Sequence, residues 1–123
     1  MPLAYLLDEH MGGPLWQAVQ THNRRGIEML DVVRLGDPPD LPRGSDDPAI
    51  LLWCEREGRL LVSEDKSTMP GHLASHLSAG HHHPGIFIPK PRSTLPQLVD
   101  FLAAAAYGSD PAEWQDRIVF IPC

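Results

Sequence analysis

Two segments decide the fold: Leu-Ala-Tyr-Leu-Leu at residues 3–7, which continues into Asp8-Glu9-His10, and Arg-Leu-Leu-Val-Ser at residues 59–63, which continues into Glu64-Asp65-Lys66. A short apolar run is typical of a strand that is buried on both faces, as in a parallel sheet. Each run ends in acid, and in open α/β sheets ligands bind outside the carboxyl ends of the strands. If the two strands are neighbours, we expect Asp8 and Asp65 to lie side by side.

The rest of the chain alternates between strand and helix patterns. Pro14 follows a glycine pair and indicates a helix start, and Asp47-Pro48 opens the clearest helix, which Gly58 ends. The pattern predicts strands at 3–7, 27–35, 59–63, 85–90 and 117–122, helices at 14–23, 47–58, within 68–80 and from Ser93 or Thr94 to 107, and a helical turn at 110–114. We therefore expect one α/β domain over residues 1–123, a three-layer α/β/α sandwich with a mostly parallel central sheet.

Size and composition restrict the classes of function. The 123 residues suit a single domain, and no apolar run approaches the roughly 20 residues that span a bilayer. The first residues lack a basic region and a cleavage site, so we predict a cytoplasmic protein without a membrane partner. A net charge of −6 argues against broad electrostatic capture of nucleic acid. This charge does not exclude a nucleic-acid enzyme, because a metal site itself requires several acidic side chains.

Carboxylates from three segments are expected at one edge of the sheet. Asp8 and Asp65 follow strands, and Asp46-Asp47 begins a helix whose start lies at the same edge. Such carboxylates repel one another unless a proton or cation joins them, and oxygen-only ligands favour Mg²⁺ or Mn²⁺. This set is typical of phosphodiester hydrolysis. Each aspartate also has a plain structural interpretation, since Asp47 can cap its helix, Asp8 can begin a turn and Asp65 can cap the next segment.

The segments "LLDEH" at 6–10, "SDDPAILLWCEREGRLLVSEDKSTM" at 45–69 and "PGIFIPK" at 84–90 resemble the PIN-like domain family. The resemblance is closest to small PIN-like putative toxins and Mut7-C-like domains, and it runs from Tyr5 to Pro122. It implies a metal-dependent ribonuclease, often the toxin of a toxin–antitoxin pair, with RNA as substrate and an antitoxin protein as partner. It also implies that Asp8, Asp47 and Asp65 are the catalytic metal ligands.

One position departs from that family pattern. Many relatives carry a second aspartate two residues after the third-strand aspartate, and this chain has Ser67 there. A hydroxyl is a poor metal ligand, so the site is one negative charge short. Glu9 or Glu64 substitutes for it, or metal binding is weak, or catalysis has been lost.

Several other side chains are candidates for the same site. Lys66, Ser67 and Arg43 are predicted substrate contacts, and Asp46, Glu64 and His72 are possible auxiliary residues. Further candidate phosphate contacts are Arg24, Arg25, Lys90 and Arg92, and most of these six cations are also explained as ordinary surface charges.

Five histidines fall within twelve positions. His72 and His76 share a helix face, and His81-His82-His83 follow shortly after. They lack the glutamate of an HExxH motif, so a polar loop beside the acidic site is favoured over a transition-metal site.

Two other classes of function remain open. A receiver-type phosphoacceptor domain also combines Asp8-Glu9, a later strand-end aspartate and a lysine before proline, but only one strand fits between Asp65 and Lys90. A catalytically degenerate PIN-like module that binds a protein is favoured by Ser67. A homodimer is plausible, because the apolar residues 118–121 suit an exposed edge strand.

Overall fold

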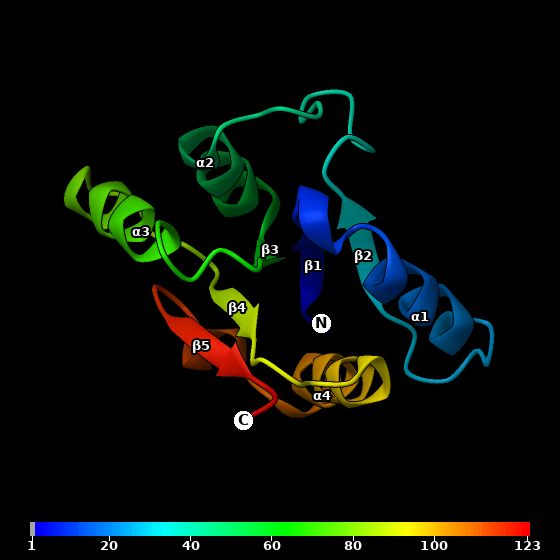
Figure 1. Ribbon diagram of the computed structural model, residues 1–123. Helices are drawn as coiled ribbons and strands as arrows, with labels where there is room; N and C mark the ends of the chain where they lie inside the picture. The colour runs from blue at the N-terminus through cyan, green and yellow to red at the C-terminus, as the bar shows by residue number, and fades with distance from the viewer. Residues whose placement is uncertain (1) are drawn as a thin grey trace.

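The computed structural model describes residues 2–123, which form a five-stranded parallel sheet with helices on both faces (Figure 1). The strand order is β2-β1-β3-β4-β5, and every neighbouring pair is parallel. The strands are β1 (Ala4–Leu7), β2 (Asp31–Arg34), β3 (Arg59–Val62), β4 (Ile86–Pro89) and β5 (Ile118–Ile121). The helices are α1 (Pro14–Asn23), α2 (Asp47–Glu57), α3 (Met69–Ser78) and α4 (Leu95–Gly108), with short 3₁₀ turns η1 (Glu9–Met11) and η2 (Pro111–Glu113). The predicted three-layer α/β/α architecture is confirmed.

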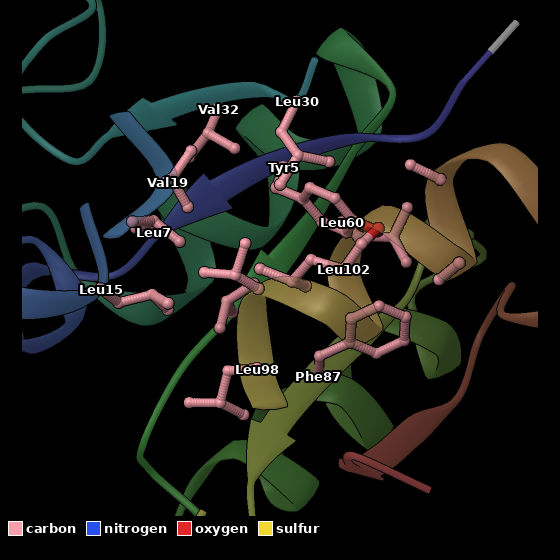
Figure 2. Close-up of a cluster of buried hydrophobic side chains, with 14 of the residues drawn as sticks. Tyr5, Leu7, Leu15, Val19, Leu30, Val32, Leu60, Phe87, Leu98 and Leu102 are labelled. Carbon is pink, nitrogen blue, oxygen red and sulfur yellow. The ribbon is translucent and has the colours of Figure 1, made fainter. Parts of the chain in front are cut away.

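Two apolar clusters define the layers. Alternation along β1 sends Tyr5 and Leu7 to one face and Leu6 to the other. The cluster that contains Tyr5 and Leu7 joins the sheet to α1 and α4 (Figure 2), and the cluster that contains Leu6 joins it to α2 and α3. β1 and β3 lie inside the sheet, so their residues 5–7 and 60–62 are buried, as their unbroken apolar runs predicted.

Two local predictions are wrong. Residues 27–30 do not join the second strand, which begins at Asp31; Ile27 and Met29 are 72% and 53% exposed. They form an irregular segment with a bend at residues 27–28, and the side chain of Asn23 bonds both the N–H and the C=O of Leu30. The cap of α2 is Asp46, whose Oδ1 accepts the N–H of Ala49 at 3.0 Å, and not Asp47.

Two further helical segments, α4 and η2, begin with the expected capping chemistry. Of the two candidates for α4, Thr94 is the cap, and it forms a reciprocal capping box with Gln97. Asp110 caps η2 in the same way. Within the described residues, none of the helices is both long and apolar enough to cross a lipid bilayer. The cytoplasmic location stays a prediction.

β5 forms one edge of the sheet, as the apolar tail predicted, and Phe120 on this strand is 45% exposed. The homodimer that this edge suggested stays a prediction.

Candidate functional site

The chain reverses its direction of winding between β1 and β3. From β1 it passes to β2 on one side, then crosses over to β3 on the other. In doubly wound folds with the order 2-1-3-4-5, the crevice at this switch point, outside the carboxyl ends of the two strands, is the usual ligand site. Asp8 directly follows β1 and Ser63 directly follows β3, so both lie at the switch point.

A chain of hydrogen bonds connects the two strand ends. The N–H of Asp8 donates to the carbonyl of Val62 at 3.0 Å, and the hydroxyl of Ser63 donates to Asp8 Oδ2 at 2.9 Å. The same hydroxyl accepts the N–H of Asp65 at 3.1 Å. Asp8 Oδ1 accepts the N–H of Glu9 at 2.7 Å, which caps η1. Asp8 is therefore held in place by both strands, and Ser63, which is fully buried, is part of the site.

The carboxylate of Asp65 is turned toward the start of α3. Its Oδ1 accepts the N–H groups of Ser67 and Thr68 at 3.1 and 2.9 Å, and its Oδ2 accepts the hydroxyl of Thr68. The hydrogen bonds from Thr68 lower the pKa of Asp65. The carboxylate is therefore ionised near neutral pH, although its own loop already uses both oxygens.

Asp47 lies in the first turn of α2 and is free of the capping role because Asp46 takes it. Its side chain is 27% exposed, and Oδ2 lies 3.3 Å from Nε2 of His72 on α3. Burial raises the pKa of Asp47; His72 opposes this shift, and the negative charges of Asp8, Asp65 and Asp46 add to it. The predicted acidic residues therefore lie close enough to repel one another, as expected for a shared edge.

These carboxylates converge on one edge but do not form a closed cage. Among residues 2–123, one group brings three candidate ligand atoms within 4.8 Å of one another, and it is a different set: Glu55, His76 and His81. Asp8, Asp47 and Asp65 do not meet that distance. A cation shared by all three would be reached in part through water, which Mg²⁺ commonly retains.

The two neighbouring glutamates face different pockets. Glu9 lines a pocket of about 180 Å³ together with Asp8, whereas Glu64 lines one of about 480 Å³ that Asp8 does not line. Of the two predicted substitutes for the missing acid, Glu9 thus shares a pocket with a predicted ligand.

The cations around the site include one that the sequence analysis missed. Arg34 ends β2 and lines the same small pocket as Asp8 and Arg43. Its guanidinium lies 4.4 Å above the ring of Trp16 and forms an ion pair of 3.1 Å with Asp37. Its position at the end of a strand beside β1 was the signal that could have identified it.

Lys66 and Ser67 lie in the exposed turn between β3 and α3. Lys66 lines the same pocket as Glu64 and Lys90. The N–H of Ser67 donates to Asp65, while its side chain faces solvent. Both residues are therefore accessible to a substrate at this edge.

The five clustered histidines divide between the two ends of the strands: the carboxyl ends, where the acidic residues lie, and the opposite, amino ends. His72, near the start of α3, reaches the acidic edge through Asp47. His76 lies near the end of α3, and His81, His82 and His83 precede β4 at the opposite edge. The expectation that this loop lies beside the acidic site is wrong, because α3 carries the chain back across the face of the sheet.

Comparison of the chain with family models, with curated proteins and with solved structures found no match. The function is therefore argued from the residues of the site.

Proposed function

We propose that this protein is a metal-dependent ribonuclease whose Mg²⁺ or Mn²⁺ site is formed by Asp8, Asp47 and Asp65. The observation that carries the proposal is that Asp8 and Asp65 follow the neighbouring strands β1 and β3, while Asp47 lies in the first turn of α2. They come from three separate segments near the carboxyl ends of the strands, where doubly wound folds bind ligands.

The donor set suits a hard cation. Carboxylate oxygens are the usual protein ligands of Mg²⁺, and two or three suffice because the ion keeps several waters. A bound ion would supply an activated water and neutralise charge on the phosphate. A cation would also remove the repulsion among the three carboxylates.

The surrounding residues have distinct supporting roles in this proposal. Ser63 orients Asp8 by donating to Oδ2, which leaves Oδ1 toward the side of Glu9. Glu9 is the proposed substitute for the acid that Ser67 does not provide. His72 contacts Asp47 at 3.3 Å across the α2–α3 interface and thereby helps to orient this carboxylate.

Substrate binding is assigned to the cations around the acidic edge. Arg34 and Arg43 lie on the β2 side, and Lys66 lies in the turn after β3. Arginine binds phosphate through a planar fork, which favours the β2 side as the path of the RNA backbone. Because the net charge is −6, RNA is held by these local cations and not by the whole surface.

Cleavage of a labelled single-stranded RNA in Mg²⁺ or Mn²⁺ tests the proposal. We expect Asp8→Asn and Asp47→Asn each to lower the cleavage rate by about 100-fold or more, since loss of even an outer partner of a metal ligand costs 10–100-fold. Asp100→Asn, at an exposed position on α4, is the matched control and retains the wild-type rate. Equal cleavage by wild type and Asp8→Asn would contradict the proposed site.

A second candidate function is a non-catalytic module that binds a partner such as an antitoxin. Ser67, in the position of a missing acid, favours it. Absence of cleavage in any divalent metal, together with tight binding to the product of a neighbouring gene, would support this module and contradict the nuclease.

The receiver-type alternative gains one observation, because receiver domains share the strand order 2-1-3-4-5. Against it, Asp65 directs both carboxylate oxygens to the start of α3. Lys90 also directly follows β4, which is the one strand between Asp65 and Lys90. Labelling of Asp65 by acetyl phosphate is the result that would favour the receiver.

A further inference from the structure

Three candidate metal ligands meet at the edge of the sheet opposite the acidic residues. Glu55 lies near the end of α2, His76 near the end of α3, and His81 in the loop that follows. Glu55 Oε1 is 3.0 Å from His76 Nε2 and 3.1 Å from His81 Nδ1. The three ligand atoms all lie within 4.8 Å of one another.

The central oxygen of this cluster is buried and unsatisfied. Glu55 Oε1 finds no hydrogen-bond partner among residues 2–123, since neither nearby imidazole nitrogen bonds it with good geometry. His76 is the most buried of the three, with 4% of its side chain exposed, and its Nε2 lies 3.0 Å from the carbonyl of His82. A buried carboxylate oxygen without a partner is costly, which indicates that something else can satisfy it.

The separations are close to those of a tetrahedral zinc site. Ligands bound at about 2.0–2.1 Å in a tetrahedron lie about 3.3–3.4 Å apart. The two separations from Glu55 Oε1 are slightly shorter than this edge, so each imidazole nitrogen would move slightly away from the carboxylate around an ion. The rings of His76 and His81 are stacked with centroids 4.9 Å apart, so His81 must turn its nitrogen toward the ion. His81 is free to do so, because 43% of its side chain is exposed.

Outer contacts already orient the cluster. The N–H of His82 donates to Glu55 Oε2 at 3.5 Å, and the N–H of His81 donates to the carbonyl of His76 at 3.2 Å. Asp116 fixes the loop from the other side by accepting the N–H of His83 at 2.7 Å and contacting His82 Nδ1 at 2.8 Å. Metal ligands in proteins are commonly held by such partners.

We propose that Glu55, His76 and His81 bind one transition-metal ion of the zinc class, with the fourth position open to solvent. Two imidazoles and one carboxylate are a known zinc donor set, whereas Mg²⁺ prefers oxygen alone. Glu55 and His81 also line an open pocket of about 610 Å³, which gives the ion a path of entry. Binding requires His76 Nε2 to release its proton to solvent and to turn from the carbonyl of His82 toward the ion.

This site is separate from the proposed nuclease site. It lies at the opposite edge of the sheet, uses none of the predicted acidic ligands and joins the ends of α2 and α3. Its proposed effect is to stabilise the packing of these two helices, and zinc at this site is not expected to support RNA cleavage.

Titration of the full chain with ZnCl₂ tests the proposal, using protein that was treated with chelator and carries no histidine tag. We expect one Zn²⁺ per chain and a rise in Tm on binding. Glu55→Gln and His81→Ala should each weaken binding by more than about tenfold, because each removes one of three ligands. His81 lies in an exposed loop, so circular dichroism of His81→Ala without metal should match that of the wild type.

His72→Ala is the matched control, because it removes the other histidine–carboxylate contact between α2 and α3. Zinc affinity should be unchanged in this variant. If His72→Ala abolishes binding while His81→Ala does not, the ion belongs to the acidic edge and the proposal is wrong. Failure of the wild type to bind one Zn²⁺ per chain would also overturn it, leaving an ion-pair network that shares protons.

X-ray absorption at the zinc edge gives a measurement that needs no variant. The proposal expects two imidazole ligands with the remaining positions filled by oxygen. A shell of oxygen alone would contradict it. Neither result depends on whether the acidic edge cleaves RNA.

Discussion

The hydroxyl of Ser63 donates a hydrogen bond of 2.9 Å to Oδ2 of Asp8 and thereby joins the end of β3 to the end of β1. The same oxygen accepts the N–H of Asp65. We expect Ser63→Ala to lower the free energy of unfolding by about 1–3 kcal/mol, because it leaves partly buried polar groups without a partner. Urea denaturation measures this change. Ser67→Ala, at an exposed position four residues on, should stay within about 0.5 kcal/mol of the wild type, and equal losses in both variants would contradict the role of Ser63.

Ser67→Asp tests the missing acid directly. If Asp65 is a metal ligand, a carboxylate two residues later should tighten Mg²⁺ binding by about 1 kcal/mol, or roughly fivefold, through added negative charge. Calorimetric titration with Mg²⁺ measures the affinity, and the RNA cleavage rate at low Mg²⁺ should rise with it. Ser75→Asp places the same charge at another exposed position, within α3, and should change neither quantity.

The two cysteines should differ in reactivity. Cys54 is fully buried, and burial raises the pKa of its thiol to about 12, whereas Cys123 is exposed. Because the thiolate is the reactive form, we expect Ellman's reagent at pH 8 to label one thiol rapidly and the other only in denaturant. Cys123→Ser should then show no rapid reaction. Rapid labelling of that variant would mean that α2 opens readily.

Protonation of Asp37 should contribute to acid unfolding. The hydrogen bond from the Arg34 side chain holds the pKa of Asp37 below its ordinary value. A folded-state pKa below the unfolded one stabilises the fold above the unfolded value, and that contribution is lost as pH falls through the folded pKa. At pH 6 the Tm of the wild type should therefore exceed that of Asp37→Asn by the equivalent of about 1 kcal/mol or less, the size typical of an exposed ion pair. The two Tm values should converge near pH 2, where Asp37 is protonated. A difference that is constant between these pH values would exclude the ion pair as its cause.

Gly85 has no room for a side chain. Its φ is 137°, and an added Cβ would lie 2.7 Å from the carbonyl oxygen of Trp114. We expect Gly85→Ala to lower the free energy of unfolding by at least about 2 kcal/mol, since backbone strain and overpacking combine. Gly58→Ala is the matched comparison, because Gly58 ends α2 with φ of 69° but faces open space. It should cost about 1 kcal/mol, the strain alone.

The sequence predicted the sheet well because its inner strands carry unbroken apolar runs bounded by glycine or acid. It failed at residues 27–30, where Ile27 and Met29 imitate strand alternation but the chain bends and the side chain of Asn23 bonds the backbone of Leu30. Two adjacent aspartates also left the cap of α2 ambiguous. The hydrogen bond from the N–H of Ala49 distinguishes Asp46 as the cap from Asp47 in the first turn.

For the candidate site, strand ends were sufficient to place Asp8 and Asp65, and a helix start to place Asp47, at the same side of the sheet. The contacts of Glu55 were not predictable in this way, because nothing in its helix pattern shows that residues 76 and 81 lie beside it. That contact depends on α2 and α3 running in the same direction on the same face of the sheet. Ser63 was missed because a single serine at the end of an apolar strand carries no distinctive pattern.

The α2–α3 pair carries carboxylate–histidine contacts at two levels: Asp47 with His72 near the starts of the helices, and Glu55 with His76 near their ends. Sliding one helix along the other by a single turn, about 5.4 Å, would separate both contacts at once. Any lengthwise shift of α2 against α3 would therefore disturb the acidic residues near the helix starts and the Glu55–His76 contact near the helix ends together.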